Sequence, residues 1–180
     1  MTKLDTKKIL FTLSGLAIVT LIVLFSRTYS AHANMKEGER FGDWVVGCEK
    51  DEKNKQVCFL SQVLTSKNEK DEKNPQHIAT FRVGYFGKAK EVKMLQILPF
   101  GTSLQSGTSI ILGKDMIIAP GKFTNCQAFG CIAVADLTKQ DIDAIANATE
   151  SYVGIISIEG KQINITMSAK GLKEGLAALK

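Results

Sequence analysis

The sequence predicts an all-β domain, an antiparallel β-sandwich or barrel, and three observations support this class. The apolar segments are short and rich in β-branched residues, which is typical of strands. Roughly nine of them recur with turn residues between them. The part of the chain that carries them, residues 34–180, has the size of one domain and can bury a core of its own.

The predicted strands follow one another with little else between them. They cover residues 44–48, 57–64, 78–85, 92–98, 109–112, 116–119, 123–126, 131–134, 152–158 and 163–167. Gly113-Lys114-Asp115 and residues 128–130 each separate two neighbouring strands, and residues 159–162 join the last two. Such short connections indicate antiparallel hairpins.

Two segments depart from the strand pattern. Thr138 followed by Asp141 predicts a capped short helix near residues 139–147. Leucines at positions 172, 176 and 179 recur with helical spacing and predict a C-terminal helix. We interpret this leucine stripe as cover for the core rather than as a ligand for a partner's groove.

Residues 1–33 have the layout of an export signal. A mostly apolar run at residues 9–25 is preceded by basic residues and followed by a small-residue exit: Lys3, Lys7 and Lys8, then Ala31-His32-Ala33. Two outcomes stay open, cleavage after Ala33 or an uncleaved N-terminal membrane anchor. In both, residues 34–180 are expected outside the cytoplasm, in the periplasm or at the outer surface.

The positive net charge of +5 belongs mostly to this leader. Residues 1–33 hold four of the 23 basic residues and one of the 18 acidic residues, so the remainder carries only +2. The lysines of Lys67 to Lys73 alternate with acids, as expected of a solvated loop. The composition therefore does not favour nucleic-acid binding.

Four cysteines lie beyond the leader, at positions 48, 58, 126 and 131. In an exported chain we expect disulfides, and three pairings are possible. We favour Cys48–Cys58 and Cys126–Cys131, because each pair flanks a turn and neighbouring antiparallel strands bring side chains within disulfide reach. A zinc site or a thioredoxin-like redox pair is less favoured, since no C-x-x-C spacing occurs.

No catalytic constellation can be recognised. His77 is the one histidine beyond the leader, and we interpret it as a solvated surface residue. The sequence contains no nucleophile elbow, phosphate-binding loop, metalloprotease motif or calcium loop. Asp141 and Asp143 fall in the first turn of a predicted helix, where capping explains them. The single tryptophan, Trp44, is interpreted as core filling.

Ordered motifs over residues 41–179 resemble the invasion-associated locus B family. They are Phe41-Gly42-Asp43-Trp44 followed by Cys48; Cys58 followed by Gln62; Leu98-Pro99, Gly101, Leu104 and Gly107; Cys126, Gly130, Cys131 and Ala133; and Gly171, Gly175, Leu176 and Leu179. The sequence departs from the family pattern at Leu172, where phenylalanine is common, and in the charged stretch Lys67 to Lys73. The resemblance implies an immunoglobulin-like β-sandwich. It further implies turns with positive φ at Gly42, Gly101, Gly107 and Gly130.

The resemblance also implies a non-enzymatic envelope or surface protein, without catalytic residues, metal or cofactor, that takes part in invasion of, or association with, host cells. The expected partner is another protein, and one on a host cell is a candidate. Membrane contact is expected only through residues 9–25, if they stay attached. Loops at the ends of the sandwich, residues 66–76 and 127–130, are the recognition candidates. A periplasmic hydrolase or a structural envelope protein with an unrecognised site is the alternative.

Overall fold

The computed structural model describes residues 36–66, 75–86 and 91–180. The chain divides into two units, residues 1–34 and residues 35–180, and every described strand and helix belongs to the second unit. The expected signal or anchor segment at residues 9–25 lies outside the described residues. Within the described ranges, no helix has the length and apolar character that crossing a bilayer requires.

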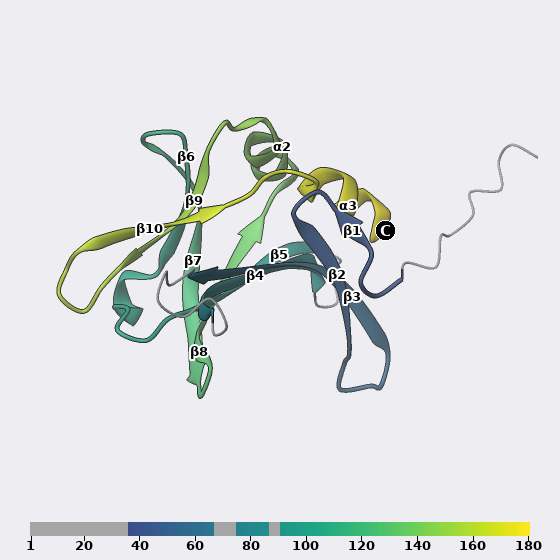
Figure 1. Ribbon diagram of the computed structural model, residues 1–180, viewed down its shortest axis with the longest axis horizontal. Helices are drawn as coiled ribbons and strands as arrows, with labels where there is room; N and C mark the ends of the chain where they lie inside the picture. The colour runs from purple at the N-terminus through teal and green to yellow at the C-terminus, as the bar shows by residue number, and fades with distance from the viewer. Residues whose placement is uncertain (1–35, 67–74, 87–90) are drawn as a thin grey trace, which may run out of the picture. The chain divides into compact units, whose positions relative to one another are not determined.

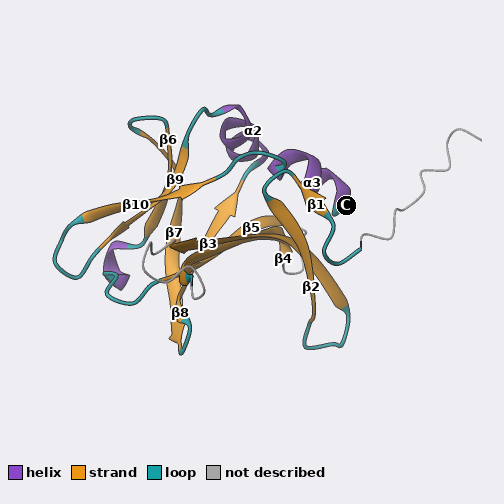
Figure 2. Cartoon of the chain, in the orientation of Figure 1, coloured by secondary structure: helices purple, strands orange, loops and turns teal. Residues whose placement is uncertain are grey.

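In the described part of the domain there are ten strands, two α-helices and one 3-10 helix (Figure 1). The strands are β1 (Arg40–Phe41), β2 (Trp44–Lys50), β3 (Gln56–Ser66), β4 (Gln76–Phe86), β5 (Glu91–Leu98), β6 (Thr108–Leu112), β7 (Met116–Gln127), β8 (Gly130–Leu137), β9 (Ser151–Ile156) and β10 (Gln162–Met167). The helices are η1 (Leu104–Ser106), α2 (Lys139–Asn147) and α3 (Leu172–Ala178). Figure 2 shows how strands dominate and where the helices lie.

The strands form one antiparallel ladder in the order β1-β2-β3-β4-β5-β8-β7-β6-β9-β10. In Figure 1 the strands β4 and β5 run across the view while β7 and β8 stand upright, so the ladder folds over on itself. Side chains of both halves meet in one core, among them Leu60 and Phe81 from the first half and Ile110 and Val153 from the second. The predicted all-β, sandwich-like class is confirmed; its two layers are halves of a continuous sheet.

The predicted break between residues 116–119 and 123–126 differs from the structure. There the chain forms one long strand, β7, that runs through Pro120 and Gly121. Ala119 has a φ of 42°, and the pairing with β8 shifts register between Phe123 and Asn125. These local distortions absorb the proline and glycine within a continuous strand, because a bulge lets the ladder resume after an irregular residue.

Both predicted helices are confirmed. Thr138 and Asp141 form a reciprocal capping box at the start of α2. The Thr138 backbone N–H donates to the Asp141 carboxylate at 2.8 Å, and the Asp141 N–H donates to the Thr138 hydroxyl at 3.1 Å. Leu172 and Leu176 of α3 are buried in the core, as core cover requires. Gly175 lets α3 approach closely, because a Cβ there would lie 2.7 Å from the Leu60 side chain.

Three segments far apart in the sequence are hydrogen-bonded at the β1 end of the ladder: residues 41–44, Gln62 and residues 168–171. We call them the clasp. The Trp44 indole N–H donates to the Ser168 carbonyl at 2.9 Å, and the Ser168 N–H donates to the Gln62 side-chain oxygen at 2.9 Å. The Asp43 N–H donates to the Lys170 carbonyl at 3.1 Å. The clasp therefore attaches the C-terminal segment to the first strands.

Two glycines make the close approach in the clasp possible. A Cβ on Gly42 would lie 2.4 Å from the Lys170 carbonyl oxygen, and one on Gly171 would lie 2.0 Å from the Phe41 carbonyl oxygen. Both glycines also have positive φ, 56° and 87°. A side chain at either position would clash with the facing backbone, and it would also strain the residue's own backbone at positive φ. The positive φ expected at Gly42, Gly101, Gly107 and Gly130 is present at all four.

Candidate functional site

The cysteines lie in two cross-strand disulfides. Cys48 on β2 is directly opposite Cys58 on β3, with Cα atoms 4.0 Å apart. Cys126 on β7 is opposite Cys131 on β8, with Cα atoms 3.9 Å apart. Both bonds tie a strand to its hairpin neighbour. In the described ranges of the chain, no cluster of histidine, cysteine and acidic residues has the arrangement to hold a metal ion.

The single histidine of the domain lies at the start of β4. His77 is exposed, and its Nε2 is 2.8 Å from the Thr80 hydroxyl. Asp141 belongs to the α2 cap, and Asp143 forms an ion pair of 2.7 Å with Lys173 of α3. The Lys173 ammonium lowers the pKa of Asp143 from its ordinary value. Asp141 thus caps the start of α2, and Asp143 links α2 to α3.

The two loops expected to carry recognition have different outcomes. Most of the loop 66–76 lies outside the described residues, which omit 67–74. The turn 127–130 joins β7 to β8, and Phe129 within it is 56% exposed. This turn sits against the end of β5: Leu98 is opposite Cys131, and a Cβ on Gly130 would lie 2.5 Å from the Leu98 carbonyl oxygen.

A third segment joins the same end of the sheet. After β5 the chain turns through residues 99–103, and there it meets the β9–β10 turn. Thr102 forms a bridge with Ser157. The Ile158 N–H donates to the Gly101 carbonyl at 2.8 Å, and the Ser103 N–H donates to the Ile156 carbonyl at 2.7 Å. The β5–η1 segment therefore lies between the β7–β8 turn and the β9–β10 turn.

Large apolar side chains are exposed on these three adjoining segments. Phe100 is 62% exposed, Leu104 47%, Phe129 56% and Ile158 76%. We call these four residues the distal apolar surface. One exposed apolar side chain is ordinary, but several on neighbouring turns are characteristic of contact sites. The family-like residues from Leu98 to Gly107 and from Cys126 to Gly130 build the backbone that presents it.

Phe100 and Phe129 are visible in the sequence as aromatics at strand ends, without any sign that they come together. The sequence does not point to Leu104 or Ile158 as site residues. The pairing of residues 101–103 with 156–158 brings Ile158 to this place, and it lies outside any continuous strand of the ladder. Residues in exposed turns do not follow the fixed period of a strand or a helix, so no periodic pattern in the sequence reveals such a surface.

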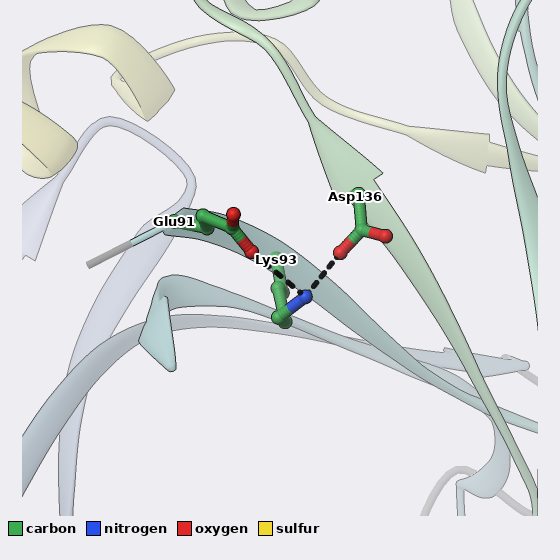
Figure 3. Close-up of polar contacts among 3 residues, drawn as sticks. All are labelled: Glu91, Lys93 and Asp136. Carbon is green, nitrogen blue, oxygen red and sulfur yellow. Dashed lines mark hydrogen bonds and ion pairs between the residues drawn. The ribbon is translucent and has the colours of Figure 1, made fainter. Parts of the chain in front are cut away.

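Several charged residues on the outer face of the sheet, opposite the core, are paired with one another. Lys93 on β5 is held between Glu91 and Asp136 of β8, as Figure 3 shows, with 3.5 Å to the Glu91 carboxylate. Its hydrogen bond with Asp136 raises the pKa of Lys93. Arg82 on β4 pairs with Glu49 at 2.8 Å and lies 4.8 Å from the centre of the Phe59 ring. The charges of Lys93 and Arg82 are therefore compensated by neighbouring carboxylates.

A cleft of about 850 Å³ lies between the α2–β9 connection and the β10–α3 connection. Its lining carries both signs of charge, from Glu150 and Glu174 and from Lys170 and Lys173. The Tyr152 hydroxyl donates to the Glu150 carboxylate at 3.0 Å, and this hydrogen bond raises the pKa of Tyr152. The mixed charges select neither an anion nor a cation, so the cleft does not by itself indicate a ligand class.

Comparisons with known proteins agree with the arrangement of these motifs. The model of the invasion associated locus B (IalB) protein family matches residues 44–180. Among solved structures, the chain is similar to invasion associated protein B from Bartonella henselae, with a TM-score of 0.64 and 18% sequence identity. That match covers 78% of this chain and 92% of the Bartonella chain, and at this identity it concerns the fold. Comparison with curated proteins finds no match. Since the family model spans nearly the whole domain, the chain belongs to the invasion associated locus B family.

Proposed function

We propose that residues 34–180 form a non-enzymatic, exported binding module that contacts another protein through the distal apolar surface. The observation that carries the proposal is the exposure of four large apolar side chains on three neighbouring segments. The β5–η1 segment is hydrogen-bonded to the β9–β10 turn and adjoins the β7–β8 turn where Leu98 lies opposite Cys131. Burial of such side chains against a partner releases roughly 25 cal/mol per Å² of apolar area. Turns held by a rigid sheet keep these side chains in place, which lowers the entropic cost of binding.

The location of the module is part of the proposal. The basic and apolar pattern of residues 1–33 supports export, and two disulfides support an oxidising compartment. The family and the Bartonella protein both carry invasion in their names, which supports a role in association with host cells. An envelope protein or a host surface protein is accordingly the partner class.

The decisive experiment removes the apolar side chains one at a time. Phe100→Ser, Phe129→Ser and Ile158→Ser replace exposed groups, so each is expected to change the free energy of unfolding by at most about 0.5 kcal/mol. Attachment of cells that produce the protein to host cells, and crosslinking to envelope proteins in situ, should both be measured. We expect each of the three variants to weaken one of these associations.

Matched controls come from exposed apolar residues elsewhere. Val63 on β3 is 60% exposed and Ile117 on β7 is 67% exposed. Val63→Ser and Ile117→Ser should leave both associations unchanged. Equal loss in controls and in distal variants would show that general stickiness, rather than this surface, is responsible. Undiminished association of all three distal variants would contradict the proposal.

Two further arms address the remaining candidates. Replacement of Lys67 to Lys73 by a Gly/Ser linker tests whether that loop contributes to the contact. A hydrolytic activity of the exported protein that disappears in His77→Ala would overturn the non-enzymatic part of the proposal. Fractionation of the producing cells, with protease treatment of intact cells, tests the location. A main pool of full-length chain in the cytoplasm would contradict export.

A further inference from the structure

The last strand of the ladder, β10, presents an open edge. Among the residues that the structure describes, β10 bonds to β9 alone, with Gln162 opposite Ile156 and Met167 opposite Ser151. The two strands form the hairpin at the left of Figure 1. The backbone groups on the other side of β10 are a template for a further strand.

This edge lacks the devices by which proteins usually prevent such pairing. Charged residues, prolines and bulges commonly protect edge strands. The segment Gln162 to Met167 contains no charged residue and no proline, and its register with β9 is continuous. The opposite end of the ladder is different. There β1 covers part of β2, the Val46 N–H bonds to the Glu39 carbonyl, and charged Glu49 and Lys50 end the strand.

The sequence of β10 is complementary to itself in the antiparallel direction. A two-fold axis at Asn164 sets this residue opposite Asn164 of a second copy. It also sets Ile163 opposite the second copy's Ile165. Gln162 then faces the second copy's Thr166. Polar residues thus meet polar residues and apolar residues meet apolar ones, with no like charges opposed. An isologous contact requires this self-complementarity.

The exposure of the strand fits the same arrangement. Gln162, Ile163 and Asn164 are exposed, whereas Ile165 and Met167 are buried in the core. Ile163 is 44% exposed although it lies on the core face of the strand, whereas Ile155 opposite it on β9 is buried. The exposure of Ile163 therefore comes from its position on the edge strand. A strand of a second copy would cover this side chain and continue the apolar row.

We propose that two copies of this chain associate by antiparallel pairing of their β10 strands about Asn164, which continues the sheet from one copy into the next. The contact uses about five residues of each copy and is smaller than a standard protein interface, so the dimer is expected to be weak, in the micromolar range. It leaves the distal apolar surface as the site for other partners.

The test is a charge exchange at the two-fold axis. Asn164→Lys sets two lysines opposite each other and Asn164→Asp sets two carboxylates opposite each other, and each should raise the dimer dissociation constant roughly fivefold. An equimolar mixture of the two variants opposes lysine to aspartate and should restore association at least to the wild-type level. Each exported protein is measured by analytical ultracentrifugation over a concentration series.

Two controls keep the result decisive. Val63→Lys puts a lysine on an exposed strand position away from β10 and should leave the dissociation constant unchanged. Circular dichroism and disulfide mapping establish that the Asn164 variants are folded. A misfolded chain cannot regain association on mixing, so rescue in the mixture supports the pairing. A monomeric wild-type protein, unaltered dimers in both single variants, or mixtures no tighter than the single variants would overturn it. Binding of an extended peptide to a monomeric wild type would likewise overturn self-pairing.

Discussion

The two ends of the strand ladder are built in opposite ways. At the β1 end, the clasp joins residues 41–44 to residues 168–171 by direct hydrogen bonds. The helix α3 also packs against β1, β2 and β3 there. At the β10 end, the β9–β10 hairpin extends with exposed Ile158 and Ile163, and the described residues place no strand beside β10 other than β9. The contrast teaches that one end stabilises the domain while the other is available for contact.

The largest expected effect is the loss of stability when a methyl group is added to a glycine at the β1 end rather than at the β10 end. Gly171 and Gly160 both have positive φ, 87° and 78°. Gly171→Ala brings Cβ onto the Phe41 carbonyl within the clasp, whereas Gly160→Ala in the β9–β10 turn meets nothing within 4 Å. We expect the first to lower the free energy of unfolding by about 3–5 kcal/mol and the second by about 1–2 kcal/mol. Urea unfolding of both variants measures the difference, and equal losses would contradict a stabilising clasp.

Removal of either disulfide is expected to lower the stability by an intermediate amount. Cys48–Cys58 closes the hairpin next to the clasp over a separation of 10 residues, and Cys126–Cys131 closes the β7–β8 hairpin over 5. In the chain-entropy model these loops contribute about 2.7 and about 2 kcal/mol. The double serine variant of the first pair should therefore unfold at lower urea concentration than that of the second. The reverse order would show that strain or residual structure outweighs loop length.

Trp44 tests the clasp through one hydrogen bond. Trp44→Phe keeps an aromatic ring but removes the indole N–H, leaves the Ser168 carbonyl without this donor and opens a small cavity. We expect a loss of about 2 kcal/mol in the free energy of unfolding. Ile163→Ser at the open end removes a side chain that is 44% exposed and should cost less, below about 1 kcal/mol. A larger loss for Ile163→Ser than for Trp44→Phe would contradict the conclusion that the β1 end stabilises the domain.

The smallest expected effect concerns pH. The ion pair with Lys173 lowers the pKa of Asp143, so its stabilisation is present above the unfolded pKa and is lost as the pH falls through the folded pKa. The same pair raises the pKa of Lys173, so that contribution is lost as the pH rises through the folded value. Asp143→Asn should flatten both limbs of the stability profile. Lys173→Met should do the same, and the double variant should add nothing further. Additive losses would contradict a direct pair.

Sequence patterns predicted much of this architecture because the signals are local. Strand alternation, the Thr138–Asp141 cap and the leucine spacing of α3 each depend on residues within a few positions of one another. The clasp and the distal apolar surface depend on which strands are neighbours, which no local pattern reveals. Gln62 illustrates the limit: the sequence marks it only as part of the Cys58–Gln62 spacing, which indicates no role for its side chain. In the structure that side chain accepts the Ser168 N–H from 106 residues away.

The same locality explains the errors. Pro120-Gly121 is a breaker pair by its chemistry, and the sequence therefore predicts two strands there. The structure keeps one strand because β7 has partners on both sides, β6 and β8, whose bonds outweigh the local preference. β1, only two residues long, and η1 escape sequence analysis because neither is long enough to show a period.

The clasp also determines when the domain can become complete during synthesis. Trp44 is among the first residues of the domain to leave the ribosome, but its hydrogen-bond partner Ser168 follows 124 residues later. The first strands therefore wait for the last segment, and contacts of such long sequence separation form slowly because a long loop must close first. A nascent or truncated chain that ends before residue 168 keeps the β1 end of its sheet uncovered. The domain therefore stays incomplete until residues 168–171 have been made, and over that time its exposed apolar surface is open to chaperones.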